Sequence, residues 1–221
     1  IRNILDLAVK HKVKRIFYSS SSEVYGEPVE MPQRELTTPL NSRLPYAIVK
    51  NLGEAFCRSY HQVHGLEYTI FRFFNTYGPK QSPDFVMSKF IRSALKNEPI
   101  TIFGDGSQTR TFCFFEDNIE ACVNAFEQGR FVNDVINIGN DRETSVLELA
   151  QMIIEKTGSS SEIIHLPPLK EGDMTRRQPD ITNMKTLLNR NLTLLEDGIH
   201  TVIQSEIFYK LNGIEAKVAH H

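Results

Sequence analysis

Short apolar runs alternate with longer amphipathic stretches along this chain, and that alternation restricts the fold more than any other feature. A buried strand gives a brief apolar, β-branched or aromatic run, whereas a helix gives apolar positions three or four residues apart. Runs of the first kind lie at 16–18, 67–74, 99–103 (before a turn at 104–106), 135–138 and 163–166, and helical patterns lie at 1–11, 45–65, 85–96, 118–128 and 145–158. Strands that alternate with helices favour a parallel sheet. We therefore predict an α/β fold.

Local signals fix the ends of several helices. Pro45 suits the first turn of the helix that follows it. Ser145 and Glu148 have the spacing of a capping box, and Gly158 can end the helix that this box begins. Beyond the last predicted strand the pattern is helical, except for a loop around residues 173–179.

The composition narrows the class of protein. The 221 residues carry 25 basic and 27 acidic side chains, spread evenly for a net charge of -2, which indicates neither nucleic-acid nor membrane binding. No apolar run reaches the roughly 18 residues of a membrane span, and no signal peptide is evident, which predicts a soluble protein. The cysteines Cys57, Cys113 and Cys122 lack a CxxC spacing and favour the cytoplasm. His61 and His64 have no third ligand, so we predict an exposed helix face and no metal site.

Tyr46 and Lys50 are the first candidates for chemistry. They lie four residues apart on one predicted helix and therefore project from the same face. A nearby ammonium favours the phenolate, so such a tyrosine can act as a base toward a sugar hydroxyl. Ser21 follows the strand at 16–18, at the sheet edge where α/β proteins bind ligands. Its hydroxyl can hydrogen-bond the same substrate oxygen.

Six motifs, in order, resemble the extended short-chain dehydrogenase/reductase family of nucleotide-sugar enzymes. They are Ser-Ser-Ser-Glu-Val-Tyr-Gly at 20–26, Tyr-Ala-Ile-Val-Lys at 46–50, Arg-Phe-Phe-Asn-Thr-Tyr-Gly-Pro at 72–79, Gly-Asp-Gly-Ser-Gln-Thr-Arg at 104–110, Ile-Asn-Ile-Gly at 136–139 and Arg-Arg-Gln-Pro-Asp at 176–180. The resemblance implies NAD as cofactor and a nucleotide-sugar, UDP-linked, as substrate.

The resemblance also assigns roles to single residues. Tyr46 would take the hydroxyl proton, Lys50 would hold the nicotinamide ribose and Ser21 would orient the sugar. The cofactor site would include Ser19, Ser20 and Phe73 besides Tyr46 and Lys50. The substrate site would include Asn75 at the nucleotide phosphates, Arg110 at the diphosphate, and Val86, Phe90 and Arg177.

The implied architecture is a truncated Rossmann-like, doubly wound parallel sheet with a smaller C-terminal substrate-binding lobe. Residues 1–74 and 111–140 would form the remaining part of the NAD-binding domain, and residues 75–110 and 141–217 would form the interleaved lobe. Residues 218–221 resemble the remnant of a tag.

The sequence departs from the family pattern in two places. The glycine-rich fingerprint that follows the first strand is absent, and the nearest glycines, Gly104 and Gly106, lie between strand-like segments. By analogy about 100 residues are missing upstream, roughly half of the sheet, so we expect the chain as given to bind NAD weakly or not at all. The usual Gly-Trp-x-Pro is replaced by Asn189, Arg190 and Asn191.

The triplet from Ser21 to Glu23 bears on the reaction. The dehydratases of the family have an aspartic acid at the position of Ser22, and a serine hydroxyl is too weak an acid to replace it. The triplet instead resembles the UDP-glucuronate decarboxylases, and Arg177 matches an arginine of their active site. We therefore predict decarboxylation, with a 4-epimerase as the alternative, then a 4,6-dehydratase, or an inactive dimerising scaffold.

The helix at 45–64 carries a wider apolar stripe than one sheet contact requires. Family members often pair through this helix and the one before it. We therefore predict a homodimer built on a four-helix bundle with residues 1–11.

Overall fold

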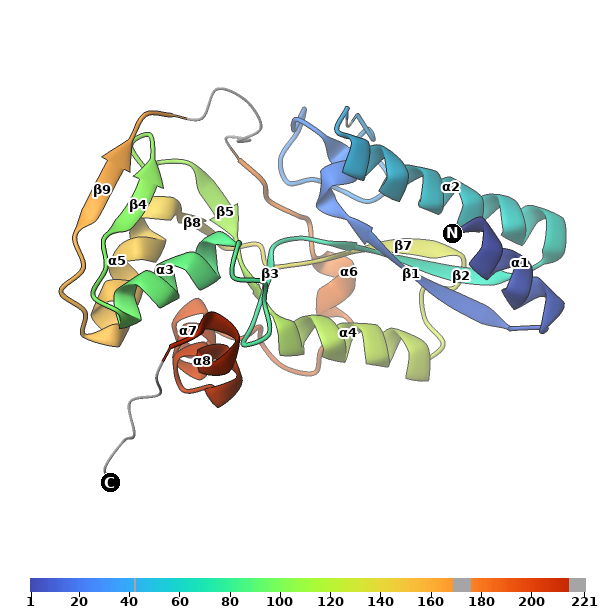
Figure 1. Cartoon of the computed structure of the whole chain (residues 1–221). Helices are drawn as coiled ribbons and strands as arrows, with labels where there is room; N and C mark the ends of the chain where they lie inside the picture. The colour runs from blue at the N-terminus through green and yellow to red at the C-terminus, as the bar shows by residue number, and fades with distance from the viewer. Residues whose placement is uncertain (42, 169–175, 215–221) are drawn as a thin grey trace.

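A computed structural model describes residues 1–41, 43–168 and 176–214. Its central element is a parallel sheet of three strands, β1 (Arg15–Ser21), β2 (Glu67–Phe73) and β7 (Asp134–Ile138), in the order β1-β2-β7 (Figure 1). The register pairs Ser21 with Phe73 and Phe73 with Ile138, so the carboxyl ends of all three strands meet at one edge.

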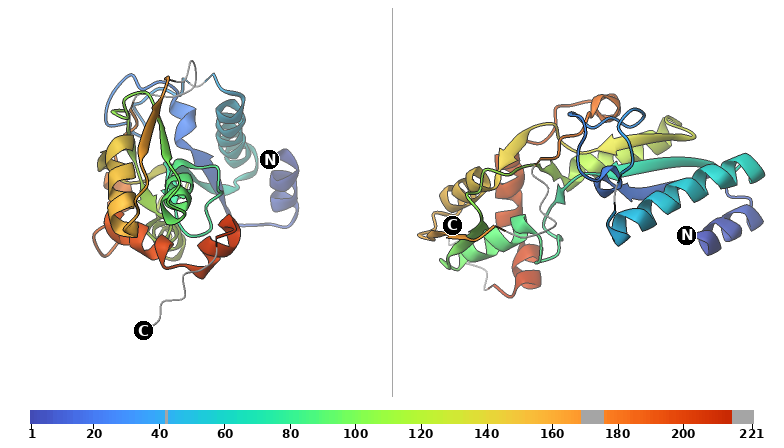
Figure 2. Two further views of the ribbon diagram at one scale, coloured as in Figure 1. Left: turned by 60° about the vertical axis from the view of Figure 1, so that its left-hand side comes forward. Right: turned by 90° about the horizontal axis from the view of Figure 1, so that it is seen from above.

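Helices cover both faces of this sheet. Helix α2 (Pro45–His64) packs on one face, and α1 (Arg2–Lys10) lies beside it (Figures 1 and 2). Helices α4 (Phe115–Glu127) and α6 (Thr182–Lys185) cover the other face, where their apolar residues form one buried cluster with β2 and β7. The predicted parallel sheet with helices on both sides is confirmed.

The second part of the molecule is the smaller lobe, on the left in Figure 1. It contains a parallel pair, an antiparallel pair and four helices: β4 (Ile100–Phe103) with β9 (Ile163–Leu166), β5 (Thr109–Thr111) with β8 (Glu143–Ser145), α3 (Val86–Leu95), α5 (Val146–Thr157), α7 (Leu195–Ile203) and α8 (Glu206–Asn212). One large apolar cluster fills the space between these elements.

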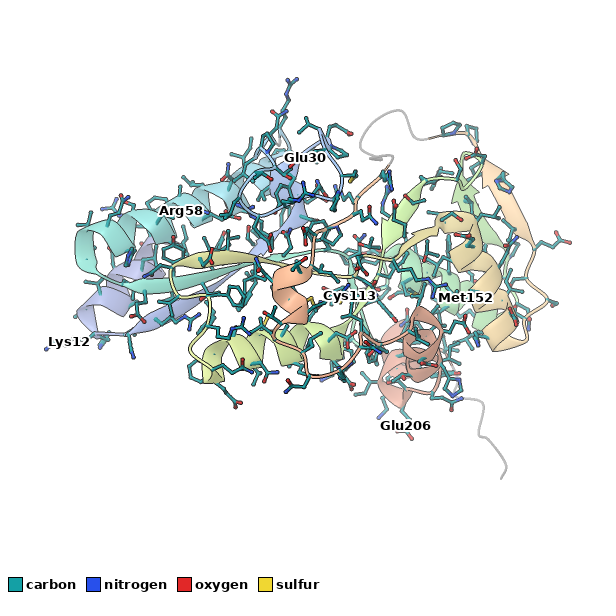
Figure 3. All side chains as sticks on the ribbon, turned by 180° about the vertical axis from the view of Figure 1, so that it is seen from behind. Lys12, Glu30, Arg58, Cys113, Met152 and Glu206 are labelled. Atoms are coloured by element: carbon teal, nitrogen blue, oxygen red, sulfur yellow. The ribbon has the colours of Figure 1, made fainter. Side chains whose placement is uncertain are left out.

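Short elements join the two parts. Strand β3 (Thr76–Tyr77) pairs in parallel with β6 (Cys113–Phe114), and a 3₁₀ turn, η1 (Ser22–Tyr25), follows β1 directly. Cys113 is fully buried near the middle of the molecule, as Figure 3 shows. The edge at which the carboxyl ends of the three strands meet faces the lobe (Figure 1).

Several boundaries differ from those predicted. Strand β1 continues through Ser21, because its backbone pairs with β2 whatever the polarity of its side chains. Helix α4 begins at Phe115, three residues earlier than predicted, with two acidic residues in the first turn, where the helix dipole favours them. Helix α6, placed within the lobe by the predicted ranges, packs against β7 instead. Residues 186–194 form no helix.

Other local predictions are confirmed. Ser145 and Glu148 form the reciprocal capping box, and Gly158 closes α5 in the left-handed conformation. The prediction for the histidines is right for His64, which is exposed, and wrong for His61, which is half-buried edge-on to Tyr68 because the end of α2 packs on β2. The predicted tail at 218–221 lies outside the described residues.

Candidate active site

The carboxyl end of β1 presents its serines to different partners. Ser21 caps η1, because its Oγ accepts a hydrogen bond from the backbone N–H of Glu23 at 3.2 Å. Ser20 points to the face covered by α2, where its Oγ donates to Glu54 Oε1 at 2.6 Å. Side chains alternate along a strand, so Ser19 and Ser21 lie on the other face. The hydroxyl of Ser20 thus anchors α2, and the hydroxyl of Ser21 caps the turn that follows the strand.

Helix α2 carries Tyr46 and Lys50 on its first two turns. Lys50 Nζ donates to the backbone oxygen of Ser19 at 2.8 Å and lies 5.6 Å from the centre of the Tyr46 ring. The Tyr46 side chain remains 58% exposed, so its phenol can reach a substrate. The predicted Tyr–Lys pair therefore lies together at the end of β1.

Two contacts of α2 set this position. A Cβ on Gly53 would lie 2.0 Å from the hydroxyl of Tyr18, so only glycine allows the helix to approach β1 this closely. The same hydroxyl donates to the backbone oxygen of Lys50 at 3.2 Å. Tyr18 thereby joins the strand to the turn of helix that carries the lysine.

A buried ion pair fixes the next turn of α2. Glu54 and Arg72 of β2 are 0% and 1% exposed and make two hydrogen bonds, of 2.9 and 2.7 Å. Burial favours the neutral carboxyl, but the hydrogen bonds and charge of Arg72 outweigh it and hold the pKa of Glu54 below its usual value. Arg72 also donates to Tyr25, which in turn donates to Asn137 Oδ1. The pair therefore connects α2 to all three strands.

Glu54 and Arg72 are functional candidates that the sequence analysis did not identify. Glu54 follows Lys50 by four residues, so the helical spacing of Tyr46 and Lys50 continues through it. This spacing could have identified Glu54, because it places an acidic residue on the buried face of the helix, where a carboxylate needs a cationic partner. No pattern within the sequence identified Arg72 as this partner.

Glu23 and Arg177 meet across the cavity although 154 positions separate them. Arg177 Nη1 donates to Glu23 Oε1 at 2.6 Å, and both side chains are mostly buried. The second oxygen of Glu23 is buried and has no hydrogen-bond partner among the described residues. Backbone bonds between Gln33 and the segment around Pro179 hold Arg177 there, with Gln33 N–H donating to Gln178 O at 2.8 Å.

A cavity of about 490 Å³ opens where these groups converge. Most of the predicted site residues line it: Ser19, Ser20, Ser21, Ser22, Glu23, Tyr46, Phe73, Asn75, Val86, Arg110 and Arg177. The structure adds unpredicted lining residues from the lobe, among them Gln81, Phe85, Met87 and Phe112.

Two predicted residues lie apart from this lining. Lys50 sits behind Tyr46, attached to Ser19. Phe90 is 5% exposed and belongs to the core of the lobe, because α3 turns that face toward β4 and α5. Asn75 lines the cavity while its amide donates to Thr111 O at 3.1 Å.

The described residues fit one end of a dinucleotide. Lys50 Nζ has N–H groups beyond the one given to Ser19, and Tyr46 beside it is exposed, which suits a ribose and a nicotinamide at this sheet edge. The 221 residues contain no glycine-rich turn for a pyrophosphate. The fit therefore covers the reactive end of NAD.

Neither a cluster of metal ligands nor a membrane-spanning helix is present in the part of the chain that the structure describes. Within it, no three side chains of His, Cys, Asp or Glu gather to hold a metal ion. No helix in that part has both the length and the apolar character needed to cross a membrane.

The segment that replaces the family's Gly-Trp-x-Pro has its own anchor. Arg190 pairs with the buried Asp117 at 2.7 Å and with Glu120 at 2.9 Å. Asp117 also accepts from the backbone N–H and the hydroxyl of Thr193, at 3.0 and 2.9 Å. Asp117 and Glu120 therefore anchor this segment, which does not line the candidate active-site cavity.

Known proteins resemble this chain in sequence. UDP-N-acetyl-alpha-D-glucosaminuronate decarboxylase of Bacillus cytotoxicus is 38% identical over 216 residues, which cover 92% of this chain and 66% of that protein. UDP-glucuronic acid decarboxylase 1 of Danio rerio is 36% identical, with coverage of 91% and 49%. The chain thus spans two thirds or less of the length of these relatives.

Solved structures agree in fold. UDP-glucuronic acid 4-epimerase from Bacillus cereus, in complex with UDP-glucuronic acid and NAD, superposes with a TM-score of 0.82 at 31% identity and covers 96% of this chain and 65% of its own. A model of the NAD dependent epimerase/dehydratase family matches residues 1–139. That match extends over more than half of the sequence, so this chain belongs to the NAD-dependent epimerase/dehydratase family.

Proposed function

We propose that the protein uses NAD to convert UDP-glucuronate, through a 4-keto sugar, to a UDP-linked pentose and carbon dioxide. The observation that carries this proposal is the Glu23–Arg177 pair, which lies in the same cavity as Ser21 and Tyr46. Two of the relatives named above are decarboxylases of UDP-linked uronates, which supports the same substrate class.

The first step would oxidise the C4 hydroxyl of the sugar to a ketone, with loss of a hydride from C4 and a proton from its oxygen. Tyr46, as phenolate, takes the proton of the C4 hydroxyl, while NAD supplies the acceptor for the hydride that leaves C4. Lys50 stabilises the phenolate by its charge and holds the cofactor ribose. Ser21 donates a hydrogen bond to the C4 oxygen as it becomes a carbonyl.

The second step would break the bond between C5 and the carboxyl carbon. The 4-keto sugar is a β-keto acid, so the electron pair of that bond moves toward the C4 oxygen as carbon dioxide leaves. Hydrogen bonds from Ser21 and the protonated Tyr46 stabilise the enolate oxygen. A proton from solvent would then add to C5. The hydride would return to C4, and Tyr46 would return its proton to the C4 oxygen, which leaves the pentose.

Arg177 would bind the substrate carboxylate. A guanidinium has five N–H donors and can serve two carboxylates at once, so Arg177 can contact Glu23 and the sugar together. Ser22 stands where acid-assisted loss of water requires a carboxylic acid, which disfavours dehydration.

A 4-epimerase acting on the same uronate is the second candidate. It requires Ser21, Tyr46 and Lys50 and room for the 4-keto sugar to turn over. A solved structure that resembles this chain is a UDP-glucuronic acid 4-epimerase, and this resemblance supports the second candidate.

Product analysis separates the two reactions. The longest natural chain that contains this sequence is incubated with NAD and UDP-glucuronate, and mass spectrometry follows the nucleotide sugars. Decarboxylation releases carbon dioxide and lowers the mass of the sugar, whereas epimerisation leaves the mass unchanged and alters the retention time. Conversion of UDP-glucose to UDP-galactose with UDP-glucuronate left untouched would contradict both uronate readings.

Variants of Arg177 and of its neighbour Arg176 test the proposed contact between Arg177 and the substrate carboxylate, with Arg176 as the control. Arg177→Ala should lower kcat/KM for UDP-glucuronate by roughly a hundredfold, since a charge-assisted pair contributes about 2–3 kcal/mol. Arg176 is exposed and pairs with Glu143 instead, so Arg176→Ala should change the rate little. Equal losses in the two variants would count against the proposed contact.

We also propose a two-fold dimer through α1 and α2. Apolar side chains on these helices remain exposed in the single chain, including Ile4, Leu7, Ile48, Leu52 and Val63. Four such helices, two from each copy, would bury them in a bundle. Light scattering at tens of micromolar tests the dimer, and a monomeric mass would count against it.

We propose a cytoplasmic location as well, because the three free thiols suit a reducing compartment.

A further inference from the structure

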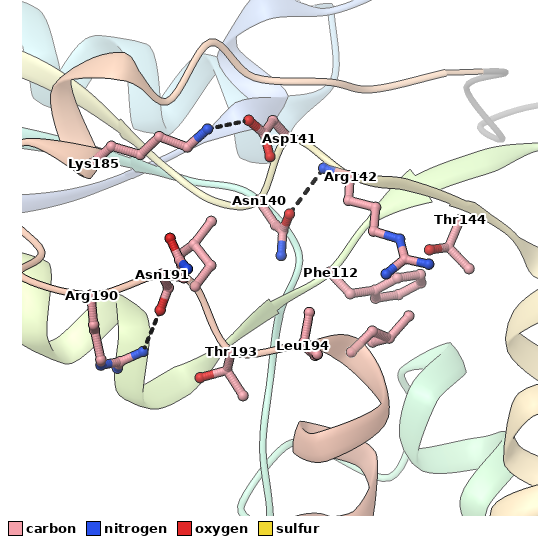
Figure 4. Close-up of a pocket in the computed structure, with 12 residues that line it drawn as sticks. Phe112, Asn140, Asp141, Arg142, Thr144, Lys185, Arg190, Asn191, Thr193 and Leu194 are labelled. Atoms are coloured by element: carbon pink, nitrogen blue, oxygen red, sulfur yellow. Dashed lines mark hydrogen bonds and ion pairs between the residues drawn. The ribbon is translucent and has the colours of Figure 1, made fainter.

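A second cavity, of about 400 Å³, lies outside the proposed active site (Figure 4). Its walls come from the loop after β7, residues 140–144, and from the segment before α7, residues 190–195. Phe112 lines both this cavity and the candidate active-site cavity, so the two are neighbours. A volume of this size is within the range of small-molecule sites.

Arg190 lies in the wall of the cavity, where its guanidinium pairs with the buried Asp117 and with Glu120 of α4. Asp117 also holds the backbone of Thr193. The walls are therefore fixed by a buried carboxylate, while the interior stays open.

Two nearly buried polar side chains line the cavity with hydrogen-bonding capacity left over. Asn140 is 8% exposed, and its Oδ1 accepts from the backbone N–H of Arg142 at 2.9 Å. Figure 4 shows the other end of this amide, Nδ2, directed into the space between the walls. Thr144 is 7% exposed, and its hydroxyl makes no hydrogen bond within the described residues. Nearly buried polar groups with unused donors call for a ligand or ordered water.

The charges around the cavity favour an anion. Lys185 is paired with Asp141 at 2.6 Å, so these two charges offset each other. Arg142 forms no ion pair within the described residues. The charge of Arg142 contributes to lowering the pKa of Glu148, after the larger effect of the hydrogen bonds with Ser145. That carboxylate accepts a hydrogen bond from the backbone N–H of Ser145 in the capping box. The remaining positive group at the cavity is the Arg142 guanidinium.

We propose that this cavity binds a small oxyanion, a carboxylate or phosphate borne on a compact apolar body. Arg142, Asn140 Nδ2 and the Thr144 hydroxyl donate to the oxyanion, and Phe112 and Leu194 pack against the apolar part. The site is separate from the substrate cavity, and its ligand touches the opposite side of the ring of Phe112.

The experiment is a titration of the ¹⁵N-labelled chain, followed by the amide signals of Arg142, Thr144 and Thr193. Benzoate supplies a carboxylate on a planar apolar body, and inorganic phosphate supplies the oxyanion alone. We expect saturable shifts with either probe and tighter binding of benzoate. Arg142→Gln should weaken binding at least about tenfold, and the isosteric Thr144→Val should weaken it severalfold.

The matched control is Arg34→Gln, which removes an exposed guanidinium that pairs with Asp180 and does not line this cavity. This variant should leave the titration unchanged. The proposal is overturned if the shifts fail to saturate, if Arg142→Gln and Thr144→Val bind as well as the unaltered chain, or if Arg34→Gln weakens binding as much as Arg142→Gln. Thermal unfolding of each variant verifies that it folds, and Thr144→Val keeps the test valid should Arg142→Gln fold poorly.

Discussion

Removal of the Arg72 guanidinium tests what holds α2 to the sheet. Arg72→Met keeps most of the side-chain volume and leaves Glu54, which is 0% exposed, without its bidentate partner. The partners left to Glu54 are the Ser20 hydroxyl and Arg58, which is 3.4 Å away and 40% exposed. The replacement also ends hydrogen bonds from Arg72 to Tyr25 and to a backbone oxygen.

The magnitude follows from this burial. Breaking a buried pair by removing one partner costs about 3–5 kcal/mol, because an uncompensated charge stays inside. A chain of this size loses about 2–4 °C of Tm per kcal/mol, so the Tm should fall by roughly 6–20 °C. Arg58→Met removes the exposed partner of the same carboxylate and should cost about 0–1 kcal/mol.

Urea unfolding followed by circular dichroism measures these changes in the free energy of unfolding. In the double variant Glu54→Leu with Arg72→Met no buried charge remains, so its loss should be smaller than the sum of the single losses by about 1–3 kcal/mol. The reasoning is refuted if Arg72→Met lowers the free energy of unfolding no more than Arg58→Met does. It is also refuted if the losses of the single variants Glu54→Leu and Arg72→Met add up to the loss of the double variant.

Further predictions concern the site and its supports. Tyr46→Phe should lower turnover of UDP-glucuronate by several powers of ten, since proton and hydride transfer are then uncoupled; unchanged kcat would contradict this role. The lowered pKa of Glu54 means that its carboxylate stabilises the fold above its unfolded pKa, about 4.3, and that this contribution is lost as the pH falls through the lower folded value. Glu54→Gln should therefore flatten the acid limb of the stability profile. Ser145→Ala should cost about 1 kcal/mol in urea unfolding through loss of the cap on α5. Calorimetry should detect weak or no NAD binding by the 221 residues alone, and micromolar affinity would contradict that expectation.

The sequence predicted the fold class because its strand and helix patterns are local. Tyr46 and Lys50 were assigned to one face of one helix from their spacing alone, and the structure has them there. Arg177 could be named as a candidate by resemblance. Its pairing with Glu23 could not be predicted from spacing, because 154 positions separate the two and the bridge between Gln33 and Pro179 brings them together.

Phe90 was assigned to the substrate site by resemblance, and the structure has it in the core of the lobe. It lies on α3 with Val86, four residues apart, and both were assigned to the substrate site. Val86 lines the cavity, whereas Phe90 points into the core of the lobe. Residues four apart on a helix are neighbours, but successive turns face different surroundings when the helix passes from a cavity edge to a core. Only the packing of α3 against α5 decides between them.

The position of Tyr46 and Lys50, the proposed catalytic pair, depends on residues to which the proposed mechanism gives no chemical role. Gly53 lowers the intrinsic stability of α2 by about 1 kcal/mol relative to alanine, which makes it an unfavourable choice for the middle of a 20-residue helix. Its absent Cβ admits the Tyr18 ring, which holds the backbone of Lys50, while Lys50 itself reaches the backbone of Ser19. A glycine that weakens the helix thus allows the close approach between α2 and the strand that ends in Ser21. Glu54, the next residue of the helix, is held by its buried pair with Arg72, and this pair stabilises α2 against the sheet at the point where glycine weakens it.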